Sequence, residues 1–107
     1  MQYEDDIQSK HKKLFLEVRN VLLSFEGIEE TKNERITSYG DENGGLCHLR
    51  AGKDGVKIGF LRGAMMEDSY GLLSGKGKLK RTLSLKSMNE EAFVYYLVQA
   101  IELNKGH

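Results

Sequence analysis

Apolar residues recur every three or four positions in two segments, one near each end of the chain. In the first segment they are Ile7, Leu14, Phe15, Val18, Val21, Leu22 and Phe25. In the last segment they are Phe93, Val94, Leu97, Val98 and Ile101. This spacing predicts an amphipathic helix over residues 3–25, which stops near Gly27, and a second helix that begins at a capping box in residues 87–90.

Between these segments the apolar period changes to two, which is typical of β-strands. The alternating apolar residues are Cys47, Leu49 and Ala51, and then Val56, Ile58 and Phe60. Because Asp54-Gly55 between them suits a tight turn, residues 45–63 are predicted to form a β-hairpin. Residues 81–86 predict a third strand. Residues 31–40 predict a fourth strand, placed toward an edge of the sheet because it is polar.

The order of these elements is helix, four strands, helix. We therefore expect an α+β fold with two layers, in which an antiparallel sheet of about four strands is flanked by the N-terminal and C-terminal helices on one face. Residues 1–107 form a single domain in this interpretation. The other face of the sheet could be solvated, form part of a binding groove, or be covered by a partner subunit in a homodimer.

Charge is balanced overall but not along the chain. Sixteen basic and sixteen acidic residues cancel, so we expect neither nucleic acid nor a membrane as the partner. Residues 26–42 are acid-rich, whereas residues 74–86 contain five basic residues and no acidic one. A single cysteine, Cys47, excludes an internal disulfide and favours a cytoplasmic location. The acidic N-terminus lacks the apolar stretch of a signal peptide.

The basic segment includes the glycine-rich stretch GLLSGKGKLKR, residues 71–81. Its spacing, its lack of a Ser or Thr after Lys78 and the strand that follows exclude a Walker phosphate-binding loop. Two alternatives stay open. One is a simple turn anchored by Leu72 and Leu73. The other is a surface that binds a small anionic ligand or an acidic partner through Arg62, Lys76, Lys78 and Arg81.

The C-terminal half also resembles a known family, the YdhG-like family of small domains of unknown function. The resemblance covers roughly residues 30–103. The motif positions that carry it are Gly59, Phe60, Gly63, Asp68, Gly71, Leu72, Leu73, Gly75, Gly77, Lys78 and Arg81. It implies a small α+β fold without an established catalytic role. Residues 41–45 depart from the family pattern, because they lack its Gly-x-Pro-x-aromatic segment, and any pocket wall built from that segment would be altered.

Some relatives in that family are described as frataxin-like iron chaperones, which makes iron the alternative ligand. Carboxylates bind Fe²⁺, and the weak metal candidates here are Glu4, Asp5, Asp6, Glu29 and Glu30. These acidic residues lie in runs without a fixed spacing to histidine. The simpler interpretation is that they are solvated or compensate a helix dipole.

No catalytic set can be assembled from the sequence. Cys47 and His48 are neighbours on a strand, so they point to opposite faces and cannot easily form a thiolate–imidazole pair. Cys47 is expected to be buried and His48 to face outward. We therefore expect a small binding domain that is not an enzyme and needs no cofactor, with an iron chaperone as the alternative function.

Overall fold

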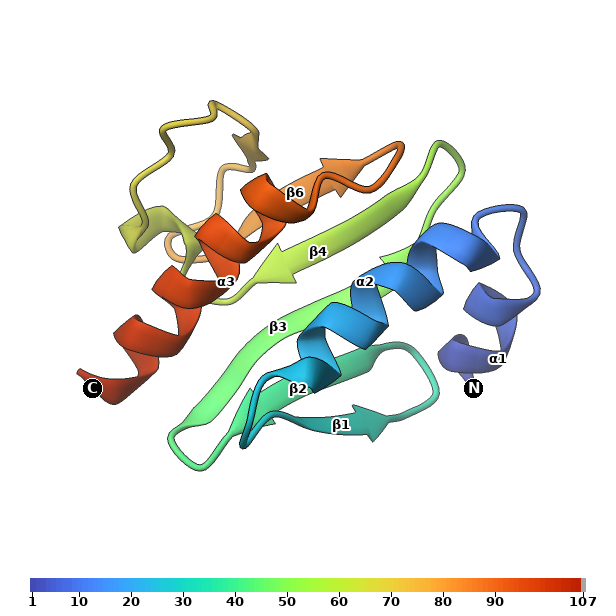
Figure 1. The fold of residues 1–107 in the computed structure, drawn as a ribbon, viewed down its shortest axis with the longest axis horizontal. Helices are drawn as coiled ribbons and strands as arrows, with labels where there is room; N and C mark the ends of the chain where they lie inside the picture. The colour runs from blue at the N-terminus through green and yellow to red at the C-terminus, as the bar shows by residue number, and fades with distance from the viewer. Residues whose placement is uncertain (107) are drawn as a thin grey trace.

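The alternating central segments pair into one six-stranded antiparallel sheet, and the amphipathic end segments form helices beside it (Figure 1). This computed structural model describes residues 1–106. The helices are α1 (Gln2–Ile7), α2 (Lys12–Ser24), the 3-10 helix η1 (Gly63–Met65) and α3 (Glu90–Lys105). The strands are β1 (Glu29–Lys32), β2 (Thr37–Asp41), β3 (Gly44–Ala51), β4 (Val56–Phe60), β5 (Leu73–Ser74) and β6 (Arg81–Leu85). The predicted α+β fold class is confirmed.

The strands lie in the order β1-β2-β3-β4-β6-β5, so β1 and β5 are the edges. The predicted hairpin is β3–β4, in which Ala51 pairs with Val56 across the turn. Gly55 has a φ of 154° at that turn, a backbone conformation that favours glycine. Strand β6 returns beside β4, with Leu83 opposite Ile58. This register places the alternating apolar residues of three neighbouring strands on one face of the sheet.

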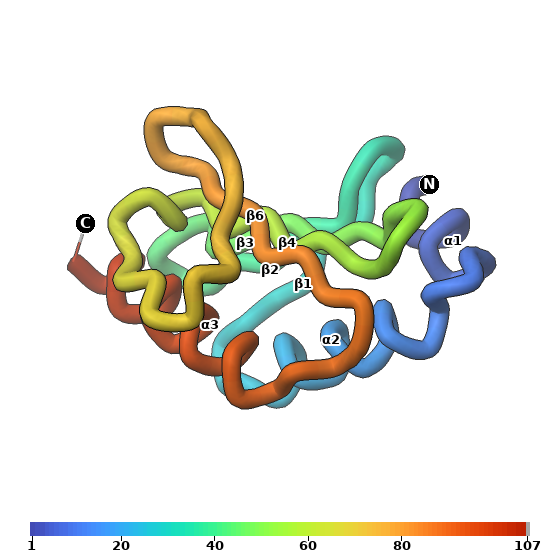
Figure 2. Tube along the Cα trace, turned by 90° about the horizontal axis from the view of Figure 1, so that it is seen from above, coloured from blue at the N-terminus to red at the C-terminus, as the bar shows by residue number. Residues whose placement is uncertain are grey.

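Both long helices cover that apolar face (Figure 2). The largest fully buried side chains include five aromatic rings, those of Phe15, Tyr39, Phe60, Phe93 and Tyr96. Phe60 of β4 contacts both Phe93 and Tyr96 of α3, at ring-centroid distances of 6.5 and 6.3 Å. Burial of such rings is the main source of stability for a domain of this size. No helix within residues 1–106 combines the length and the apolar character that a membrane crossing requires.

The first helix is not continuous, contrary to the prediction of one helix over residues 3–25. It breaks between α1 and α2, where the Ser9 hydroxyl donates to the Asp6 carbonyl oxygen (2.8 Å) and accepts from the His11 N–H (3.2 Å). A serine side chain that bonds to the nearby backbone competes with the helical pattern. The break lets α1 turn against β3, where the Asp6 carboxylate accepts from the Ala51 N–H (3.0 Å).

Two further boundaries differ from the sequence prediction. Residues 31–40 do not form one strand, because the Asn33 side chain accepts from the N–H groups of Arg35 and Ile36 and makes a turn between β1 and β2. The last helix begins at Glu90, and Asn89 caps it by accepting from the Ala92 N–H (3.2 Å). The expected capping box at residues 87–90 was therefore placed two residues too early.

The face of the sheet opposite α2 and α3 is called the open face here. Two loops rise above it, the turn at residues 33–36 and the loop at residues 75–80 (Figure 2). Side chains between them make a shallow depression, the trough. It is lined by Ile36, His48, Arg50, Lys57, Gly59, Lys80 and Thr82. From the sequence, the open face could be solvated, form part of a binding groove, or be covered by a partner subunit. In the structure it carries a hollow.

Candidate anion-binding site

Strand register assembles the trough from residues that are far apart in the sequence. His48 of β3 lies opposite Gly59 of β4, and Gly59 lies opposite Thr82 of β6. In the next row on the same face, Arg50 lies opposite Lys57. Because side chains on a strand alternate between faces, these polar residues point away from the core that their apolar neighbours fill. The prediction that His48 faces outward is confirmed.

The floor of the trough is flat because Gly59 has no side chain. A Cβ atom added there would lie 2.6 Å from Cε and 3.2 Å from Nζ of Lys80. Lys80 therefore reaches from the 75–80 loop across the floor, above the centre of the sheet. The hollow has a volume of about 160 Å³, which corresponds to roughly five water molecules.

The trough is positively charged on three sides. Arg50 comes from β3, Lys57 from β4 and Lys80 from the 75–80 loop. Among the described residues that line it there is no Asp or Glu. Like charges that converge on one hollow repel each other, and an anion placed between them removes that repulsion.

His48 is the fourth titratable group of the trough, and it is half-buried. Burial lowers the pKa of its imidazole below the usual value, and the nearby charge of Lys80 lowers it further. Its Nδ1 atom is buried and has no hydrogen-bond partner within residues 1–106. A buried polar atom without a partner is uncommon in proteins and calls for an explanation.

The residues that the sequence assigned to ligand binding are dispersed in the structure. Arg81 donates to the carbonyl oxygens of Gly77 (2.6 Å) and Lys80 (2.8 Å), so its guanidinium holds the 75–80 loop in shape. Lys76 and Lys78 are exposed on that loop, beside the trough. Arg62 donates to Asn104 on α3 (3.1 Å). Arg62 therefore points toward the helix layer, and Lys76 and Lys78 are not among the residues that line the trough.

Several of the motif positions that carry the family resemblance have structural roles. The Asp68 carboxylate accepts from the Tyr96 hydroxyl, which lowers the pKa of Asp68, and from the Leu72 N–H (3.1 Å). Gly71 has a φ of 67°, where a side chain would be strained. The expectation that both leucines anchor this segment is wrong for Leu72, which is 40% exposed, whereas Leu73 of β5 packs against the core.

Two of the acidic residues considered for iron, Glu30 and Asp6, have protein partners. The Glu30 carboxylate binds Arg19 through two oxygens (2.6 and 2.9 Å) and accepts from the Tyr39 hydroxyl (2.6 Å). Asp6 is buried at the end of α1 rather than at its start. Within residues 1–106, no group of three or more His, Cys, Asp or Glu could hold a metal ion.

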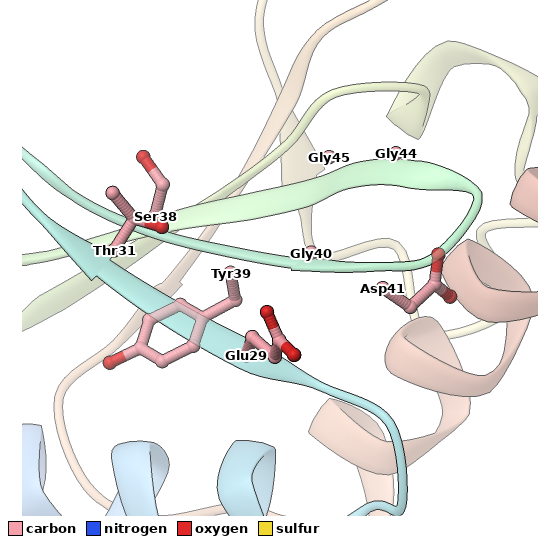
Figure 3. Close-up of a pocket in the computed structure, with 8 residues that line it drawn as sticks. All are labelled: Glu29, Thr31, Ser38, Tyr39, Gly40, Asp41, Gly44 and Gly45. Carbon is pink, nitrogen blue, oxygen red and sulfur yellow. The ribbon is translucent and has the colours of Figure 1, made fainter.

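Of the other acidic candidates, Glu4 pairs with the N-terminal amine (3.4 Å), and Asp5 is exposed on the first turn of α1. Glu29 of β1 lines a second pocket of about 270 Å³, near the β2–β3 turn (Figure 3). Three glycines, Gly40, Gly44 and Gly45, form much of its floor. Its two acidic lining residues are Glu29 and Asp41, and the Asp41 carboxylate accepts from the Asn104 side chain on α3 (3.2 Å).

Cys47 is buried on the apolar face, as predicted. Burial raises the pKa of its thiol to about 12, which leaves it protonated and unreactive at neutral pH. With His48 on the opposite face, these two residues do not form a nucleophile–base pair.

A scan against protein-family models found no match, and searches of curated proteins and of solved structures found none either. The resemblance to the YdhG-like family therefore stays a prediction. The trough residues Arg50, Lys57 and Lys80 were missed at the level of sequence. The signal that points to two of them is the alternation of β3 and β4, which places Arg50 and Lys57 on the polar face.

Proposed function

We propose that this protein is a small binding domain that takes an anionic ligand into the trough of its open face. The observation that carries the proposal is the convergence of Arg50, Lys57 and Lys80 on one hollow whose described lining contains no carboxylate. The exposed Lys76 and Lys78 on the neighbouring loop extend the positive potential outward and would speed the approach of an anion. The ligand site thus moves from the loop, where the sequence placed it, onto the sheet beside it.

The size of the trough favours a small charged group over a whole nucleotide. Pockets that enclose drug-sized ligands measure about 300–1,000 Å³, whereas the trough measures about 160 Å³. An oxyanion such as phosphate fits that volume, and the rest of a larger ligand would lie outside it. A single-stranded nucleic acid is disfavoured, because proteins bind it by stacking bases on aromatic rings, and no Phe, Tyr or Trp is among the described lining residues.

Isothermal titration calorimetry with inorganic phosphate tests this proposal. The informative variant is Arg50→Ala/Lys57→Ala, which removes two charges of the trough. Its control is Lys12→Ala/Lys13→Ala, which removes two exposed charges at the start of α2, in the helix layer. We expect the trough variant to bind at least roughly tenfold more weakly, because each hydrogen bond to a charged group contributes about 1.5–3 kcal/mol.

A third variant, Lys76→Ala/Lys78→Ala, separates the trough from the loop. We expect it to bind phosphate nearly as tightly as the wild type, with a slower association. If this variant loses binding while the trough variant keeps it, the ligand site is on the loop and the trough assignment fails. If the wild type binds neither phosphate nor sulfate, the proposed function itself is wrong.

Three other expectations from the sequence stay proposals: iron binding, a homodimer and a cytoplasmic location. Iron binding by surface carboxylates is less favoured than anion binding, because Glu30 and Asp6 already have protein partners. A homodimer through the open face would cover the trough, so ligand binding and self-association through that face would compete. The free thiol of Cys47 is compatible with the cytoplasmic location that we propose.

A further inference from the structure

His48 lines the trough beside its three basic residues. Its ring stands in the row formed by Ser38, His48, Gly59 and Thr82 across four neighbouring strands. Its Nδ1 atom is buried and lacks a partner among residues 1–106. A protonated imidazole needs an acceptor for each N–H group, and residues 1–106 supply none for Nδ1.

The titratable groups that line the trough with His48 are all cationic. They are Arg50 on its own strand, Lys57 on β4 and Lys80 from the 75–80 loop. The turn at residues 33–36 contributes Ile36 to the lining, and β6 contributes Thr82, neither of which titrates. These neighbouring positive charges disfavour the protonated form of His48, and a dianion bound among them would favour it.

We propose that His48 couples anion binding to proton uptake, so that the trough takes a terminal phosphate group together with one proton. This inference rests on the proposed function, because it needs an anion in the trough. The proton comes from solvent to the imidazole, and the imidazolium N–H then donates to a phosphate oxygen. This transfer breaks an O–H bond of hydronium and forms an N–H bond on the imidazole, and no bond of the phosphate group changes.

The arrangement of donors selects a tetrahedral oxyanion over a planar carboxylate. Arg50, Lys57 and Lys80 come from three different elements, and the Thr82 hydroxyl adds a neutral donor beside them. Donors that converge from several directions match the three terminal oxygens of a phosphate ester, whereas a carboxylate offers two oxygens in one plane.

The test is calorimetric titration with sulfate, which stays a dianion over the range in which histidine titrates, about pH 5–8. Inorganic phosphate changes its own charge in that range and is therefore unsuitable for the pH series. We expect the sulfate affinity of the wild type to rise as pH falls, by up to about tenfold for each unit by which binding raises the pKa of His48. Titrations at one pH in buffers of different ionisation enthalpy should show the uptake of up to one proton.

The variant His48→Gln isolates the effect, and His11→Gln is its control, because His11 bonds to the Lys53 carbonyl oxygen (3.2 Å) outside the trough. We expect His48→Gln to bind sulfate with nearly constant affinity across the pH range and His11→Gln to behave as the wild type. If sulfate binds without proton uptake, or if His48→Gln keeps the pH dependence, the coupling is overturned while the anion site stands. If no variant binds sulfate at any pH, the anion site fails as well.

The source of the phosphate group is tested at a single pH with inorganic phosphate and with glycerol phosphate. Glycerol phosphate that binds at least as tightly as inorganic phosphate supports recognition of a terminal phosphate on a larger molecule. Binding of inorganic phosphate alone would overturn that part of the proposal and assign the site to the free ion.

Discussion

The substitution Gly59→Ala places a methyl group on the floor of the trough, where Lys80 now lies. The added Cβ would stand 2.6 Å from Cε and 3.2 Å from Nζ of Lys80. Non-bonded carbon atoms pack at about 3.5–4.0 Å, so the end of the lysine must move by roughly 1 Å or more. Because that end is the tip of a flexible side chain, it can swing away without moving the backbone.

The stability of the fold should change little. Gly59 lacks a positive φ, so alanine fits its backbone. Glycine inside a strand costs roughly 0.5–1 kcal/mol relative to alanine, and a forced rotamer of Lys80 costs a similar amount, about 0.5–1.5 kcal/mol. We expect these effects to cancel to within about 1 kcal/mol, which corresponds to a change in Tm of no more than about 4–8 °C.

Anion binding, in contrast, should weaken. Displacement of Lys80 removes one charged contact, whose contribution is about 1.5–3 kcal/mol, so the Kd for phosphate should rise roughly 10- to 100-fold. Titration calorimetry gives the Kd and differential scanning calorimetry gives the Tm. Unchanged phosphate affinity with the fold intact would refute the placement of Lys80 in the site.

The control is Gly63→Ala, whose added Cβ would meet atoms that cannot swing away. It would lie 2.5 Å from the Cβ and 2.9 Å from the backbone nitrogen of Arg81. Such overpacking costs about 1–3 kcal/mol, so this variant should lose stability. A Gly63→Ala variant as stable as the wild type would contradict the close approach of η1 to β6.

Two predictions concern the carboxylates of Asp6 and Glu30, whose bonds join the helix layer to the sheet. Burial raises the pKa of Asp6, so its carboxyl group binds a proton more tightly in the folded state than in the unfolded state. The wild type should therefore gain stability relative to Asp6→Asn as pH falls below neutral. Urea unfolding at several pH values measures this difference in stability, and a difference that shrinks as pH falls would contradict the prediction. Burial acts to raise the pKa of Glu30, but its bonds from Arg19 and Tyr39 leave it lowered. Glu30→Gln should therefore lower the free energy of unfolding by roughly 2 kcal/mol at neutral pH. This loss of stability should shrink as pH falls through the lowered pKa of Glu30. An equal loss at acidic pH would refute the role of the Glu30 charge.

Much of the fold follows from local patterns in the sequence. The three- to four-residue period of the end segments identifies helices, and the strict alternation from Cys47 to Phe60 identifies a hairpin whose Gly55 allows the turn. The break at Ser9 does not follow, because it depends on whether the hydroxyl bonds to the nearby backbone or to solvent. The turn at Asn33 was missed for the same reason, since the asparagine side chain makes it.

The candidate site was harder to predict than the fold because it depends on pairing between distant strands. The short turn of the β3–β4 hairpin already places Arg50 opposite Lys57. The addition of Thr82 and Lys80 requires β6 to return beside β4 in one particular register, which no local pattern specifies. The basic loop was the candidate site in the sequence because four basic residues fall within residues 76–81, yet Arg81 of that segment binds carbonyl oxygens of its own loop.

The central claim, an anion site in the trough of the open face, is tested most directly by an NMR titration of the amide signals with inorganic phosphate. The account predicts saturable shifts that are concentrated on the row His48, Gly59 and Thr82, with smaller shifts in the 75–80 loop. Shifts that do not saturate, or that are confined to the loop around Lys76 and Lys78, would contradict it.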